Sequence, residues 1–142
     1  MSLTLTTAQS IIADALAAGQ QHNFKPLTVV VLDAGGHVIA AARQDGASNN
    51  RFEIAQGKAY GALALGMGSR AIMERAEQQA YFIAAATATL GGRLIPVPGG
   101  VLVRDNDGTI LGAVGISGDS SDNDEAAAST AIKAAGLTAQ ID

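Results

Sequence analysis

Hydrophobic and polar positions near the start of the chain alternate with a helical period and then with a strand period. Apolar side chains recur every three or four positions over residues 7–20, which predicts an amphipathic helix capped by Thr6. Pro26 prevents that helix from continuing, and residues 27–32 form an apolar, β-branched run typical of a buried strand. An Asp-Ala-Gly-Gly turn then leads into residues 37–43. A helix followed by a β-hairpin is therefore expected.

The rest of the chain repeats these kinds of element. Residues 101–117 read as a second hairpin around an Asp-Asn-Asp-Gly turn, and residues 91–100, rich in Gly and Pro, read as an ordered loop. Three further helices are predicted over residues 49–66, 69–83 and 124–135. Together these elements predict one α+β domain spanning residues 1–142. Its mainly antiparallel central sheet is built from two β-hairpins and flanked by helices.

Composition narrows the classes of protein that fit. Hydrophobic residues make up 48% of the chain and charged residues only 15%, against about 25% charged in average domains. That shortfall favours a homo-oligomer, a dimer or larger. The net charge of −4, without a basic cluster, argues against nucleic acid. With no cysteine, no leader-like start and no apolar run of about 20 residues, we expect a soluble cytoplasmic protein that does not bind membranes.

The two histidines offer little conventional chemistry. Neither His22 nor His37 has neighbours at the spacing of a zinc site or a catalytic triad. A lone histidine can serve as an axial ligand of haem, which makes His22, at the end of the first helix, the candidate. A surface or capping role is the alternative for the same side chain.

Lys58 is the most suggestive charged residue. It lies on an alanine-rich helical face, where a cation either extends outward or meets an anion. Arg43, at the end of a strand, is a second candidate cation. Accessible backbone N–H groups and a hydroxyl are offered by Gly99, Gly100, Gly115 and Ser117. If these groups converge, they form a site for a small carboxylate. Replacing Lys58 with Met is then expected to weaken ligand binding without loss of stability.

Several short motifs, in order, resemble those of the GlcG/HbpS-like family. The resemblance covers the chain from the first helix to the last. The matching segments are residues 31–40, 43–47, 54–59, 98–100, 112–118 and 124–128. It implies a profilin-like α+β fold, assembly into dimers or higher oligomers, and ligand pockets near subunit contacts. The family includes haem-binding proteins and a domain fused to corrinoid adenosyltransferases. Gln56 stands where a second acidic residue would complete a paired-carboxylate iron site with Glu53.

Three functions are consistent with these observations. The first is a small-molecule-binding accessory protein whose ligand is haem or another tetrapyrrole. The second is a cofactor-independent enzyme acting on a small carboxylate or hydroxy acid. In that enzyme Lys58 would anchor the anion, and Asp33 or Asp124 would move a proton. The third is an assembly subunit without a ligand. A wide apolar pocket favours the first function, and a small polar pocket holding Lys58 beside a carboxylate favours the second.

Overall fold

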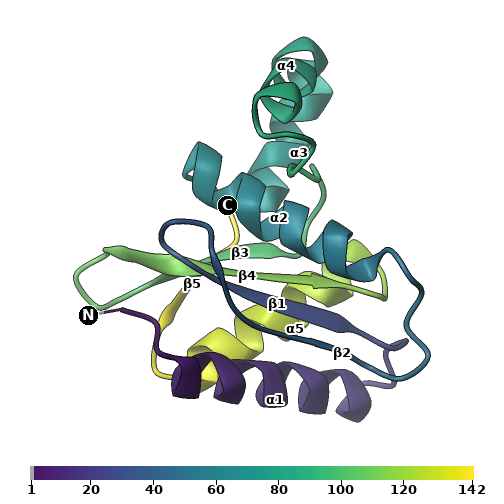
Figure 1. Cartoon of the computed structure of the whole chain (residues 1–142), viewed down its shortest axis with the longest axis vertical. Helices are drawn as coiled ribbons and strands as arrows, with labels where there is room; N and C mark the ends of the chain where they lie inside the picture. Colours follow the sequence, from purple (N-terminus) through teal and green to yellow (C-terminus); the bar gives the residue numbers. More distant parts are fainter. Residues whose placement is uncertain (1) are drawn as a thin grey trace.

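A five-stranded antiparallel sheet forms the middle layer of the molecule in a computed structural model that describes residues 2–142. The strand order is β2-β1-β4-β3-β5, so the two predicted hairpins lie side by side through β1 and β4. Figure 1 shows this layer between helices. The strands are β1 (Thr28–Asp33), β2 (Val38–Arg43), β3 (Gly100–Arg104), β4 (Ile110–Ser117) and β5 (Thr138–Gln140).

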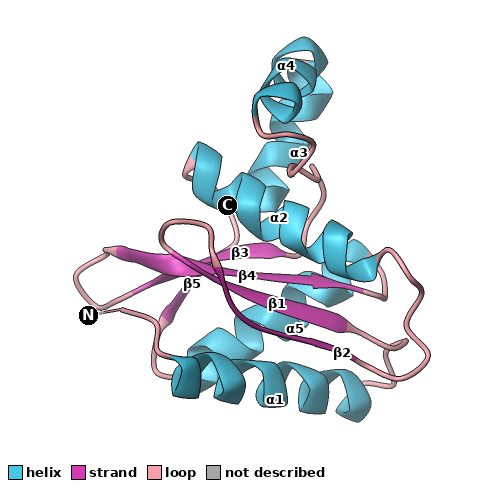
Figure 2. Cartoon of the chain, viewed as in Figure 1, coloured by secondary structure: helices cyan, strands magenta, loops and turns pink. Residues whose placement is uncertain are grey.

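Helices cover both faces of the sheet. α1 (Leu5–Gln21) and α5 (Ser121–Ala134) pack on one face, and α2 (Arg51–Leu65) packs on the other (Figure 2). α3 (Ser69–Gln78) and α4 (Ala80–Thr89) project away from the sheet beyond α2. The predicted α+β architecture, with an antiparallel sheet flanked by helices, is confirmed. No helix within residues 2–142 combines the length and the apolar character needed to cross a membrane.

Side chains of β1 alternate between the two cores, as the two-residue period of a strand requires. Val29 and Val31 contribute to the core under α1 and α5, whereas Val30 and Leu32 contribute to the core under α2. All four are fully buried. This explains why the strand appears in the sequence as a continuous apolar run rather than an alternating one.

Some predicted helix boundaries were wrong. The first helix is capped by Thr4, whose side chain accepts a hydrogen bond from the Thr7 amide, so it begins before the expected Thr6 cap. The helix predicted over residues 69–83 breaks at Gln79, whose φ of −137° and ψ of 61° separate α3 from α4. The last helix begins at Ser121, and the short strand β5 had no recognisable pattern.

The packing of α2 on the sheet depends on small residues. Its buried side consists of Ala55, Gly57, Lys58, Ala59, Gly61 and Ala62. The facing strand positions include Gly100 and Gly115, where a Cβ atom would collide with the Lys58 and Ala55 carbonyl oxygens respectively. The helix backbone therefore lies directly against the strands, closer than ordinary side chains would permit.

Replacing Gly115 with Ala should destabilise the protein by about 3 kcal/mol, because α2 would have to move away from β4 and strain both packed layers. Urea denaturation followed by circular dichroism measures this change. Gly61→Ala is the matched control, because the added Cβ would first meet the Leu94 side chain, at 3.0 Å, and not a backbone carbonyl, and alanine favours the helix. Equal stabilities of the two variants would contradict this account of the packing.

Candidate functional site

Lys58 is the largest fully buried side chain in the core, with 2% of its surface exposed. Its Nζ donates to the Ile116 carbonyl oxygen at 2.9 Å and to Asp124 Oδ2 at 3.1 Å. The side chain thus extends from α2 past the end of the sheet and reaches a carboxylate on α5. A buried ammonium group needs such partners, because an isolated charge is very costly away from water.

Glycine at position 99 makes room for this side chain. Gly99 has a φ of +120°, and a Cβ there would lie 2.8 Å from Lys58 Nζ. The neighbouring Gly100 is held by Ser69, whose Oγ accepts from the Gly100 amide at 2.7 Å. The turn before β3 is therefore shaped around the Lys58 ammonium group and fastened to the start of α3.

Asp124 is positioned by the first turn of α5. Ser120 caps this helix by accepting a hydrogen bond from the Asn123 amide at 3.1 Å. Asp124 Oδ1 accepts from the Asp119 amide at 3.0 Å, which leaves Oδ2 for Lys58. A carboxylate near a helix N-terminus is also stabilised by the helix dipole. Asp124 is 1% exposed, so both members of the pair are withdrawn from solvent.

Burial shifts the proton equilibria of both groups toward their neutral forms. It lowers the pKa of Lys58, an effect that the Asp124 charge opposes and the nearby Arg51 charge reinforces. Burial also raises the pKa of Asp124, against the opposing influence of Lys58 and the Asp119 amide. Shifted pairs of this kind occur at functional sites and also in structural ion pairs.

Most of the predicted carboxylate-site residues lie near one another. Lys58 contacts the turn at Gly99, and Gly100 and Gly115 lie against the backbone of α2. Asp124 occupies the position beside the ammonium group where an external anion had been expected. Lys58 is therefore neutralised by the chain itself in this conformation, and its role in ligand binding stays a prediction.

Two of the predicted residues lie away from this pair. Asp33 pairs with Gly112, four positions along β4 from Ile116, which corresponds to about 13 Å. Its carboxylate accepts from the Gly35 and His37 amides, and the His37 hydrogen bond is the main reason that its pKa is lowered. Arg43 lies on β2, two strands from β4, and is exposed.

Arg51 is a residue near Lys58 that the sequence reasoning missed. It is the first residue of α2, and its Nη1 donates to Ser117 Oγ at 3.1 Å. A cation at the N-terminal end of a helix is disfavoured by the helix dipole. A positively charged residue at the predicted start of a helix is a signal that the sequence does carry. It indicates that Arg51 is there for an interaction outside the helix.

His22 lies on the opposite face of the sheet, at the end of α1. Its ring stacks on Phe24 with 5.7 Å between ring centroids, beside a cavity of about 240 Å³. The cavity lies between the end of α1 and the start of α5. The lining residues are Ala18, His22, Phe24, Asn123, Ala126, Ala127 and Thr130. No group of three or more His, Asp or Glu side chains within residues 2–142 is arranged to bind a metal ion.

Lys58→Met should destabilise the protein by about 3–5 kcal/mol, because it leaves the Asp124 carboxylate buried without its cation. The pairing thereby reverses the expectation of unchanged stability drawn from sequence. The double variant Lys58→Met/Asp124→Leu is the matched control, and it should recover much of the loss. Chemical denaturation at pH 7 measures all three proteins. A stable Lys58→Met variant would contradict a tight ion pair.

The loss of folding stability in the single variants Lys58→Met and Asp124→Asn should depend on pH, in opposite directions. In Lys58→Met, the unpaired Asp124 has a folded pKa above its ordinary 3.8, so the variant loses stability as pH rises through this range and is least impaired in acid. In Asp124→Asn, the unpaired Lys58 has a folded pKa below its ordinary 10.5, so stability is regained as pH rises toward that value. Urea midpoints between pH 4 and pH 10 test both slopes.

The sequence of this chain is similar to those of known proteins. The model of the family described as haem degrading protein HbpS-like matches residues 3–133. An uncharacterised 15.0 kDa protein encoded between dhaT and dhaS in Citrobacter freundii is 31% identical over 131 residues, which cover 92% of this chain and 90% of that protein.

Solved structures agree with this match. The crystal structure of a PduOC:heme complex is similar with a TM-score of 0.86 and 26% identity, covering 96% of this chain and 97% of that one. Klebsiella pneumoniae protein ORFY is similar with a TM-score of 0.85 and 28% identity, covering 94% and 90% respectively. The family model extends over nearly the whole chain, from before α1 into α5. The chain belongs to the HbpS-like family.

Proposed function

We propose that this protein is a small-molecule-binding accessory protein whose ligand is haem or another tetrapyrrole, with His22 as the axial ligand. The observation that carries the proposal is a histidine beside a mostly apolar cavity. The His22 ring stacks on Phe24 and lines this cavity. The fold of the chain resembles that of the protein in the PduOC:heme complex over 96% of its length. A neutral imidazole nitrogen is a common ligand of haem iron.

The dimensions of the cavity bear on how a macrocycle would bind. Its volume of about 240 Å³ lies below the 300–1,000 Å³ typical of pockets that enclose a drug-sized ligand. One chain therefore covers only part of a tetrapyrrole, with Phe24 and the alanines of α5 against the ring. A second copy of the chain covers the remainder. Tetrapyrrole binding and self-association are accordingly linked in this proposal.

The cofactor-independent enzyme is the second candidate, and the Lys58–Asp124 pair is the observation that favours it. The pair places a lysine beside a carboxylate, as that function requires, and burial shifts the pKa of each group. Both side chains are almost fully buried, however, and within residues 2–142 Lys58 does not line the cavities of about 120, 240 and 310 Å³. A substrate would reach the pair only after the surrounding loops opened.

Self-association should be measurable without any ligand. The low proportion of charged residues, 15%, leaves apolar surface that subunit contacts can cover. Multi-angle light scattering at micromolar concentration should report a dimer or a larger assembly. A clean monomer of 14.2 kDa would remove the second copy from the proposal.

Hemin titration tests the tetrapyrrole proposal directly. The apoprotein should give a sharpened, saturable Soret band, and His22→Ala should shift this band and weaken binding by about tenfold or more, because the iron loses its axial nitrogen. His37→Ala is the matched control, since it removes the only other histidine from the turn between β1 and β2. A broad spectrum like that of nonspecifically bound hemin, or equal effects of the two variants, would refute the proposal.

A further inference from the structure

Arg51 carries a positive charge that no carboxylate neutralises. Its Nε donates to Ser48 Oγ at 3.0 Å and its Nη1 to Ser117 Oγ at 3.1 Å. Among residues 2–142, no carboxylate oxygen lies within 4.0 Å of this guanidinium group. A guanidinium has five N–H donors, and two neutral hydroxyls leave most of that capacity free. The nearby Lys58 adds positive charge, but Asp124 already pairs with it.

Thr28 provides a second, independent sign of a missing partner. It is 1% exposed, and its Oγ1 is buried without a hydrogen bond in the part of the chain that the structure describes. Leaving a buried hydroxyl unpaired is costly, and such groups are rare in folded proteins. Val30 and Leu32, on the same side of β1, pack beneath α2. Thr28 therefore faces the α2 layer.

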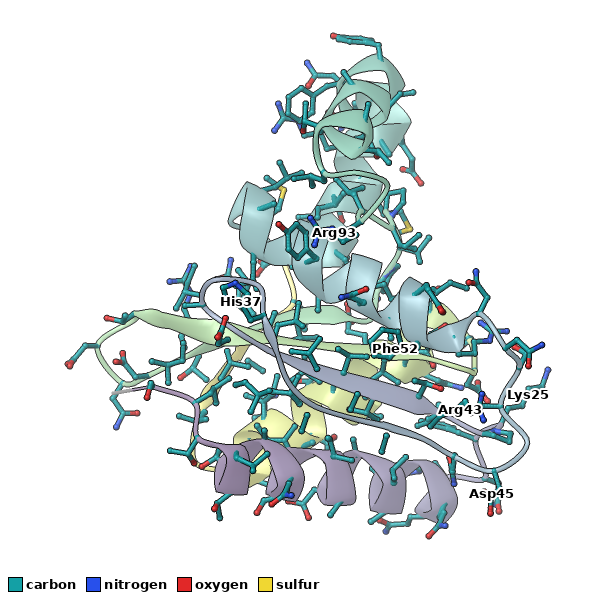
Figure 3. The ribbon with its side chains drawn as sticks, viewed as in Figure 1. Lys25, His37, Arg43, Asp45, Phe52 and Arg93 are labelled. Atoms are coloured by element: carbon teal, nitrogen blue, oxygen red, sulfur yellow. The ribbon has the colours of Figure 1, made fainter. Side chains whose placement is uncertain are left out.

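The sheet register brings these groups into one row. Thr28 lies opposite Ser117 on β4 and opposite Arg43 on β2. Arg51 donates to the Ser117 hydroxyl from above this row. Figure 3 shows Arg43 and Phe52 at this end of the molecule, with His37 at the far end of the sheet. The end of the sheet beneath the start of α2 thus holds two cationic side chains and two hydroxyl groups. They belong to Arg43, Arg51, Thr28 and Ser117.

The first turn of α2 adds backbone donors. Asn50, its N-cap residue, makes no side-chain capping bond. The first N–H groups of a helix have no partner within the helix, and they bind anions when side chains do not cap them. The acidic side chains of the neighbouring segments are Asp45 on the loop before α2, Glu53 in its first turn and Asp119 on the loop after β4, and none of them pairs with Arg51 within 4.0 Å. Asp119 has its own partners. Its carboxylate is already bonded to the Lys25 and Ser120 amides and to Asn123.

We propose that the end of the sheet beneath the first turn of α2 binds a small oxyanion, a carboxylate or a phosphate, through Arg51, Ser117 and Thr28. The guanidinium group turns from the Ser117 hydroxyl to two oxygens of the anion, which matches its planar fork. The released Ser117 hydroxyl and the unpaired Thr28 hydroxyl then donate to the same anion. The site lies on the opposite face of the sheet from His22, so it is independent of tetrapyrrole binding.

Anion titrations of the ¹⁵N-labelled full chain test this site. Sodium acetate and sodium phosphate are added separately in low-salt buffer, and backbone amide shifts are followed by NMR. We expect saturable shifts centred on Phe52, Glu53 and Ser117 with at least one of the two anions. Saturation by acetate identifies the ligand class as a carboxylate, and saturation by phosphate identifies it as a phosphate.

Variants separate a built site from general charge effects. Arg51→Gln should lower affinity by about ten- to hundred-fold, because a charge-assisted hydrogen-bonded contact is lost. Arg93→Gln is the matched control, since Arg93 is exposed and stacks on Tyr60 instead. Thr28→Val keeps the shape of the side chain, so stability should hold or rise while affinity for the anion falls.

The proposal is overturned if the shifts grow linearly with either anion, or if Arg51→Gln and Thr28→Val both bind as the unmodified protein does. Thr28→Val keeps the test decisive even if Arg51→Gln folds poorly. Hemin titration of Arg51→Gln should match that of the unmodified protein. A failure of anion binding is therefore distinguishable from a failure of the tetrapyrrole proposal.

Discussion

The close approach of α2 to the sheet is the constraint on which the rest of the structure depends. Glycine at positions 100 and 115 lets the helix backbone lie against β3 and β4. Only at this separation does the Lys58 side chain reach the Ile116 carbonyl of β4 and Asp124 of α5. The same approach sets the first turn of α2, with Arg51, directly over Ser117. The two glycines therefore determine both the packing of α2 and the positions of the polar groups of Lys58 and Arg51.

The Lys58–Asp124 pair joins layers that the sheet separates. Lys58 belongs to the helix on one face, and Asp124 to a helix on the other face. A hydrophobic pair of similar volume could fill this space with similar or greater stability. An ion pair adds a directional requirement that apolar packing lacks, because a shift of either helix leaves a buried charge unpaired. The relative placement of α2 and α5 is therefore specified more tightly than contact area alone would specify it.

The fold was largely predictable from the sequence, and the sites were only partly so. Apolar runs and Asp-x-x-Gly turns identified both hairpins because these signals are local. The break at Gln79 carries no Gly or Pro, and β5 is three residues long, so neither had a local signal. Lys58 was noticed for its alanine-rich surroundings. Its pairing with Asp124 joins positions 66 residues apart in the chain, a relation that only the folded structure makes visible.

The arm formed by α3 and α4 has a consequence for how the molecule opens. Its small core, centred on Ile72, Ile83 and Leu94, is separate from the two cores against the sheet. α4 packs chiefly on α3 (Figure 1), so few contacts with the sheet layers are lost when it detaches. Local unfolding free energies follow such contacts. We therefore expect amide hydrogens of α4 to exchange with solvent through partial opening of the arm, and those of β1 and β4 to exchange only when the whole sheet unfolds.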